Sequence, residues 1–156
     1  MTLNPLPAKS IPAPKAKTIY PKPFAHLVEG RTKRKLGDYF GLNNFGVNLT
    51  QLAPGSVSAL LHHHSKQDEF IYVLEGNPTL VLGEEKFVLS PGDCYGFKAN
   101  TGIASQVINE SNEAVSFLEI GDRTAGDEVE YPNDDLKAVQ LDNGKWQLSR
   151  KNGEPY

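Results

Sequence analysis

Short apolar runs that alternate with turn signals mark most of this chain and constrain its fold more than any other feature. From Leu36 onward the runs are separated by Gly, Pro, Asn and Asp, as in Ser90-Pro91-Gly92-Asp93. The pattern predicts eight strands, over Gly46–Leu52, Ser58–His64, Glu69–Leu74, Thr79–Leu82, Lys86–Leu89, Cys94–Phe97, Ser105–Asn109 and Val115–Ile120. A sustained helical period is absent, and the nearest candidates, residues 35–42 and 132–139, are short. Many short strands at near-regular spacing indicate an all-β sandwich or barrel.

The segments on either side of these strands differ from them in composition. A length of 156 residues fits one domain. We expect an extended Pro-rich arm over residues 1–35, a β-barrel over residues 36–121, and a C-terminal segment over residues 122–156 that wraps the barrel, with Trp146 as a packing anchor. Prolines between residues 4 and 23 disfavour helix in the arm. The arm either lies across the domain or a partner subunit, or it is a partly disordered tail.

Charge and cysteine content exclude several functional classes. The formal net charge is −3, and the densest basic run, Arg31–Lys35, is short, so we interpret it as a solvated loop and expect no nucleic-acid partner. Prolines interrupt the N-terminus, so we expect neither a signal peptide nor a membrane span. The single cysteine, Cys94, excludes an intramolecular disulfide and is consistent with a reducing compartment. We expect a cytoplasmic protein.

The stretch Leu61–Gly76, "LHHHSKQDEFIYVLEG", holds three of the four histidines. Side chains alternate along a strand, so His62 and His64 share one face with the apolar Leu60. If Glu69 faces the same interior, two imidazoles and a carboxylate converge in a facial arrangement that suits Fe, Mn, Ni, Co, Cu or Zn. The alternative is that the histidines are only polar side chains at a strand end.

The spacing of this stretch resembles the first motif of the cupin superfamily, a glycine, His-x-His, a glutamate and a second glycine. Here these are Gly55, His62, His64, Glu69 and Gly76, and only the first gap departs, by one residue. The second motif resembles the stretch from Pro91-Gly92-Asp93 through "CYGFKANTGIASQVIN". The segments "LGDYFGLNNFGVNLTQLAPGSVS", "GDEVEYPNDD" and "RKNGEPY" resemble a subgroup of small single-domain bacterial cupins that is sometimes labelled as sugar-phosphate isomerases. The resemblance implies a double-stranded β-helix, the cupin jelly-roll barrel, and a divalent metal ion.

One position departs from the family pattern. The second motif of metal-binding cupins ends in a histidine ligand, and Ser105 stands where that histidine is expected. By alternation Ser105 faces inward together with Val107 and Asn109. A neutral hydroxyl is a much weaker transition-metal ligand than imidazole. Either His62, His64 and Glu69 hold the metal, with Ser105 reached directly or through water, or the site is metal-free and its histidines bind a ligand or act as acid and base.

Three functional hypotheses follow. The first is a metal-dependent enzyme with isomerase- or oxygenase-type chemistry on a small polar metabolite, for which the resemblance suggests a sugar phosphate. A phosphate calls for inward basic residues, and Lys86 and Lys98 stand at strand edges. The second is a binding module without turnover, and the third is an interaction protein that uses the outer sheet and the arm. Cupins commonly pair through their sheets, so we expect a homodimer.

Overall fold

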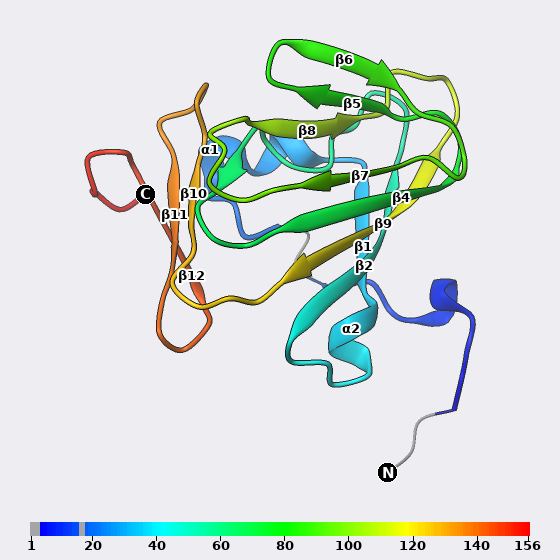
Figure 1. The fold of residues 1–156 in the computed structure, drawn as a ribbon, viewed down its shortest axis with the longest axis horizontal. Coiled ribbons are helices and arrows are strands. Elements are labelled where there is room, and N and C mark those ends of the chain that lie inside the picture. The colour runs from blue at the N-terminus through cyan, green and yellow to red at the C-terminus, as the bar shows by residue number, and fades with distance from the viewer. Residues whose placement is uncertain (1–3, 16–17) are drawn as a thin grey trace.

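Antiparallel β-strands make up most of the regular secondary structure (Figure 1). A computed structural model describes residues 4–15 and 18–156. The strands in these residues are β1 (Arg31–Lys35), β2 (Phe45–Leu52), β3 (His63–His64), β4 (Glu69–Glu75), β5 (Thr79–Leu82), β6 (Glu85–Val88), β7 (Cys94–Phe97), β8 (Ser105–Ile108), β9 (Val115–Asp122), β10 (Glu128–Glu130), β11 (Lys137–Gln140) and β12 (Trp146–Ser149). The all-β class predicted from the apolar runs is confirmed.

Two sheets build the barrel and enclose one apolar core. One has the order β1-β2-β9-β4-β7, and the other, which lies above it in Figure 1, has the order β6-β5-β8. Side chains from both sheets meet in this barrel core: Leu52, Ile71, Leu80, Val107, Val115 and Phe117. Along β4, Ile71 and Val73 are buried, whereas Phe70 and Tyr72 are exposed. The predicted alternation is therefore confirmed, and the architecture is the cupin double-stranded β-helix.

A third sheet, which we call the C-terminal sheet, closes one end of the barrel. Its order is β12-β11-β10-β3, and strands β10 to β12 form the layer at the left of Figure 1. A second apolar group, which we call the C-terminal cluster, lies beneath it: Leu60, Val129, Tyr131, Leu136 and Ala138. Trp146 packs against this cluster, as predicted. The histidine strand β3 pairs with β10, so this sheet takes part in placing the histidines.

The N-terminal segment packs on the barrel. It contains the 3-10 helices η1 (Ala8–Ser10) and η2 (His26–Val28) and the short helix α1 (Lys22–Ala25). Ile11 is 4% exposed, and the Tyr20 hydroxyl accepts a hydrogen bond from the Leu60 amide at 3.3 Å. The described part of the arm therefore lies across its own domain, and short helical turns replace continuous extended chain there.

Arg31–Lys35, which we interpreted as a solvated loop, forms β1 and pairs with β2 over its full length. That interpretation was wrong, because alternate residues of this basic run have different partners. Lys33 Nζ lies 2.7 Å from Glu119 Oε2, and Arg34 donates a 2.8 Å hydrogen bond to the side chain of Gln51. Alternation of partners, rather than of hydrophobicity, makes this run a strand.

The predicted strand over Ser58–His64 is also largely wrong, since only His63–His64 is a strand. Isolated bridges, Val57 to Ile108 and His62 to Ser105, replace a continuous ladder. Side chains bind the backbone groups in between: Gln106 donates to the Ala59 carbonyl at 2.7 Å. The region therefore crosses the end of the three-stranded sheet as an irregular segment that ends in the histidines.

The two candidate helical windows have different outcomes. Residues 35–42 contain α2 (Leu36–Tyr39), whereas residues 132–139 form turns followed by the start of β11. Among the described residues, the longest helices are far too short and polar to cross a membrane. The homodimer and the cytoplasmic location remain predictions.

Candidate metal centre

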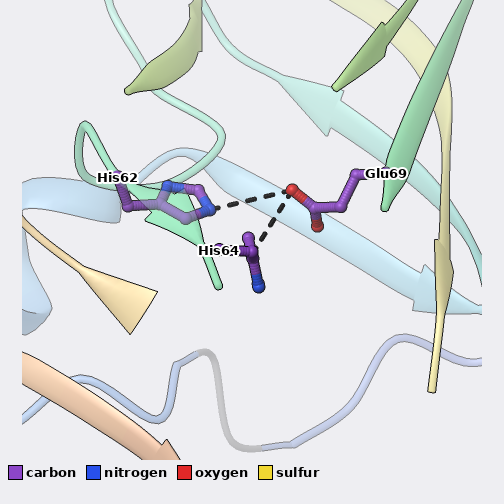
Figure 2. Close-up of side chains that lie close together, drawn as sticks. All are labelled: His62, His64 and Glu69. Carbon is purple, nitrogen blue, oxygen red and sulfur yellow. Dashed lines mark ion pairs between the residues drawn. The ribbon is translucent and has the colours of Figure 1, made fainter. Parts of the chain in front are cut away.

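His62, His64 and Glu69 come together at the end of the barrel that the C-terminal sheet closes (Figure 2). One nitrogen or oxygen from each lies within 4.8 Å of the others. Glu69 Oε2 is 3.4 Å from His64 Nε2 and 3.9 Å from His62 Nε2. The convergence that the spacing predicted is therefore present.

The three side chains reach this point from different parts of the fold. His62 is bridged to Ser105 at the start of β8, His64 ends β3, and Glu69 begins β4. His63 points away and lies 3.7 Å from Glu130 Oε2 of β10. The predicted alternation of the three histidines therefore holds, even though most of the predicted strand does not.

His62 is fixed by a backbone group and an aromatic ring. Its Nδ1 lies 2.7 Å from the Leu60 carbonyl oxygen, so Nδ1 donates and Nε2 keeps a lone pair that faces Glu69. The ring stacks on Tyr131 with centroids 5.8 Å apart. Burial lowers the pKa of His62 below its ordinary value, and the charges of His64 and Lys33 act in the same direction, while Glu69 opposes them. A neutral imidazole, the form that binds metals, is therefore favoured.

His64 is fixed by a carboxylate. Its Nδ1 lies 2.5 Å from Oδ2 of Asp127, the residue that precedes β10, and its ring meets Trp146 edge-on at 6.3 Å between centroids. Burial alone would raise the pKa of Asp127, but hydrogen bonds from His64, the Lys66 amide and the Ser65 hydroxyl bring it below its ordinary value. The sequence analysis quoted Asp127 within "GDEVEYPNDD" but gave it no role.

Ser105 faces the same cavity, as predicted. It is 8% exposed and lines, with His62, His64 and Glu69, a cavity of about 20 Å³, which suffices for an ion or one water molecule. Lys98 lines this cavity too. A second cavity, of about 150 Å³, shares His63 and His64 with the first and is lined by carboxylates of β10.

The interior also holds a basic residue that the sequence analysis missed. Lys33 of β1 forms its 2.7 Å ion pair with Glu119 of β9, and the Thr50 hydroxyl donates to the same carboxylate oxygen at 2.7 Å. The side chains of Lys33 and Glu119 are 30% and 20% exposed. Lys33 is held in this pair and also acts electrostatically on His62. Recognising it would have required identifying β1 as a strand.

Comparison with known proteins agrees with this geometry. The family model described as "Cupin domain" matches residues 48–121. The crystal structure of a cupin-superfamily sugar phosphate isomerase from Silicibacter pomeroyi is 35% identical, with 98% of this chain and 96% of that chain covered and a TM-score of 0.89. This chain belongs to the cupin superfamily.

Two further solved structures extend the comparison. One, from Acidithiobacillus ferrooxidans and described provisionally as a sugar phosphate isomerase, is 33% identical, with 81% of this chain and 80% of that chain covered and a TM-score of 0.71. A polyketide cyclase from Streptomyces resistomycificus, 18% identical over 78% of this chain and 80% of that chain with a TM-score of 0.62, shares the fold alone. The sequence has no significant match among curated proteins.

Proposed function

We propose that this cupin is a metal-dependent enzyme that acts on a small polar metabolite, and that isomerisation of a sugar phosphate is its reaction class. One observation carries the proposal: His62, His64 and Glu69 present their donor atoms to one another at a small pocket. The two relatives described as sugar phosphate isomerases, one of them provisionally, support the reaction class.

The donor set fits a divalent transition metal. Protein nitrogens and oxygens bind such ions at about 2.0–2.2 Å, so two donors on one ion lie about 3–3.5 Å apart. The observed Nε2 to Oε2 separations of 3.4 Å and 3.9 Å need only small side-chain adjustments. Two imidazoles and a carboxylate suit Fe, Mn, Ni, Co, Cu or Zn. Such an ion, when bound, supplies Lewis acidity for a carbonyl or hydroxyl oxygen, or a place for dioxygen in an oxygenase.

Lys98 is the residue that we assign to an anionic substrate. It lines the small cavity, and its side chain is 76% exposed while paired with Asp68 at 2.9 Å. An exposed pair of this kind contributes only about 0–1 kcal/mol, so the ammonium can exchange its partner for a phosphate at little cost. Glu128 and Glu130 line the neighbouring cavity, so the phosphate is expected on the Lys98 side and hydroxyl groups near β10.

The second candidate function is a metal-free binding module without turnover. It is favoured by Ser105, which occupies the position of the last histidine ligand and offers only a hydroxyl at the cavity. Loss of a group that hydrogen-bonds to a metal ligand typically costs about 10–100-fold in metal affinity, so loss of an imidazole ligand should cost at least as much. Metal content separates the two functions.

The test is elemental analysis by mass spectrometry of protein purified without an affinity tag. Wild type is compared with His62→Ala and with Ser105→His, which restores the missing imidazole. Near-stoichiometric metal in the wild type that is lost in His62→Ala supports the enzyme. An empty wild type beside a metal-filled Ser105→His variant supports the binding module.

Turnover is tested on the metal-loaded wild type. Aldose and ketose phosphates are incubated with the protein, and their interconversion is followed by NMR. Oxygen uptake by the Fe(II)-loaded protein tests the oxygenase alternative within the same site. Fully loaded protein that shows neither activity across the panel would contradict the enzyme proposal.

A further inference from the structure

We infer that Asp127 is a positioning residue of the metal centre, one that holds the proton of His64 on Nδ1 and keeps its Nε2 lone pair directed toward Glu69. The inference rests on the proposed metal site. It assigns a role to a residue outside the matched range, residues 48–121. Three features support it: the position of Asp127, the hydrogen-bond partners of its two oxygens, and the tautomer of His64 that a facing carboxylate favours.

The backbone around Asp127 fixes the position of its buried side chain. Its side chain is 0% exposed, and it follows a turn in which Gly126 adopts a φ of +74°, a left-handed conformation that glycine accommodates without strain. The Asp127 carbonyl accepts a 2.9 Å hydrogen bond from the Gln140 amide at the end of β11. The C-terminal sheet therefore delivers a rigid carboxylate to the back of His64.

The two carboxylate oxygens of Asp127 have separate partners. Oδ1 accepts hydrogen bonds from the Ser65 hydroxyl at 3.0 Å and from the amides of Lys66 and Gln67 at 2.7 Å and 3.3 Å. Oδ2 lies 2.5 Å from His64 Nδ1 and from no other hydrogen-bond donor among the described residues. Oδ1 thus fixes the segment that follows β3, and Oδ2 accepts a hydrogen bond from the imidazole.

The chemistry of the pair fixes the tautomer of His64. A carboxylate only accepts hydrogen bonds, whereas a neutral imidazole has one donor nitrogen and one acceptor nitrogen. His64 faces a carboxylate on each side, but Asp127 Oδ2 is at hydrogen-bond distance from Nδ1, at 2.5 Å, whereas Glu69 Oε2 is 3.4 Å from Nε2. In the neutral ring Nδ1 therefore carries the proton, and Nε2 keeps its lone pair. Carboxylate–histidine–metal arrangements of this type orient the ligand and increase its basicity.

Asp127→Asn is the substitution that separates positioning from structural support. The asparagine oxygen can replace Oδ1 and keep the three hydrogen bonds to the Ser65–Gln67 segment. Its amide group then faces His64 Nδ1 as a donor, which moves the imidazole proton to Nε2, the atom proposed to bind the ion. Ser65→Ala is the matched control, because it removes a partner of Oδ1, together with the acceptor of the Glu128 amide, and leaves the contact between Oδ2 and His64 Nδ1 in place.

The first readout needs no metal. Nitrogen-15 NMR of the metal-free protein at neutral pH distinguishes the two tautomers of each histidine. We expect His64 to carry its proton on Nδ1 in the wild type and in Ser65→Ala, and on Nε2 in Asp127→Asn. An Nε2-protonated His64 in the wild type would overturn the inference. The wild-type spectrum gives this result even if Asp127→Asn does not fold.

The second readout is metal affinity, measured for Zn²⁺ by competition with a chromophoric chelator. We expect Asp127→Asn to bind about 10–100-fold more weakly than the wild type, and Ser65→Ala to stay near the wild-type value. Equal affinity of Asp127→Asn and wild type would overturn the inference. A wild type that binds no Zn²⁺ would refute the proposed metal site instead, and the NMR arm would still decide the tautomer.

Discussion

The barrel and the C-terminal sheet make different contributions to the same site. The barrel provides Glu69 on β4 and Ser105 on β8, and its own apolar core lies between two sheets. The C-terminal sheet places Asp127 behind His64 and Tyr131 against His62. Glu69 therefore comes from the barrel, and His64 comes from β3 of the C-terminal sheet. Asp127 and Tyr131, which contact the two imidazoles, lie outside the matched family range, residues 48–121.

The two imidazoles are oriented by different kinds of hydrogen-bond acceptor. A backbone carbonyl of the preceding segment, Leu60, accepts from His62, whereas a side-chain carboxylate accepts from His64. A carbonyl has no net charge, while a carboxylate bears one and can be altered by substitution. Substitution of Asp127 therefore acts on His64, whereas substitution of Tyr131 acts on His62.

Substitution of the barrel core should have the largest effect on stability. Phe117 is 0% exposed and lies at the centre of this core, so Phe117→Ala should lower the free energy of unfolding by about 3–5 kcal/mol. Urea denaturation followed by far-UV circular dichroism measures the change. A loss near zero would mean that Phe117 is not part of a close-packed core.

Substitution in the C-terminal cluster should cost a similar or smaller amount and also affect the site. Leu136 is 0% exposed, so Leu136→Ala should lower the free energy of unfolding by about 2–5 kcal/mol. The single tryptophan, Trp146, packs against this cluster, so its fluorescence reports on this region specifically. Under conditions where both variants are folded, we expect Leu136→Ala to bind Zn²⁺ more weakly than Phe117→Ala does. Unaltered affinity would show that the sheet does not support the site.

The pH dependence of stability should separate His62 from the other histidines. Its folded-state pKa lies below its ordinary value, so the unfolded chain takes up a proton first as the pH falls. The stability contribution is fully present above about pH 6.5 and is lost below it, at no more than about 1.4 kcal/mol per pH unit for one proton. In chelator-treated protein, the free energy of unfolding of His62→Gln should depend less steeply on pH than that of wild type as the pH falls below about 6.5. Identical slopes would contradict the assignment to His62.

The smallest effect on stability is expected at the cavity mouth. Lys98→Ala removes an exposed ion pair and should change the free energy of unfolding by about 0–1 kcal/mol. Lys86→Ala, which removes the exposed pair with Glu110, is the matched control. Binding of inorganic phosphate to metal-loaded protein, measured by calorimetry, should weaken in Lys98→Ala and not in Lys86→Ala. Equal binding by both variants would remove Lys98 from the substrate site.

Sequence patterns predicted several barrel strands well because turn residues bound the short apolar runs that form them. Thr79–Leu82 and Cys94–Phe97 were predicted with their observed bounds. β1 was missed because its alternation is one of polar partners, Glu119 inside and Gln51 outside. The short strands of the C-terminal sheet were missed because their sequence is largely polar and because β10 pairs with β3, which is remote in sequence.

The candidate site could be predicted only as far as local spacing reaches. His62, His64 and Glu69 lie within one short stretch, so alternation and motif spacing were enough to bring them together. Asp127 is 63 positions from His64, and a single sequence holds no signal that joins them. Tyr131 is equally remote in sequence from the imidazole that it stacks on. Tertiary packing supplies these orienting contacts.

X-ray absorption spectroscopy at the edge of the bound metal tests directly whether His62, His64 and Glu69 bind the ion. The account predicts that Zn²⁺-loaded wild type shows two imidazole ligands at about 2.0–2.1 Å with oxygen donors completing the shell. It further predicts that His64→Ala has at most one imidazole ligand. A wild-type spectrum without imidazole scattering, or one unchanged in His64→Ala, would contradict a metal centre built from His62, His64 and Glu69.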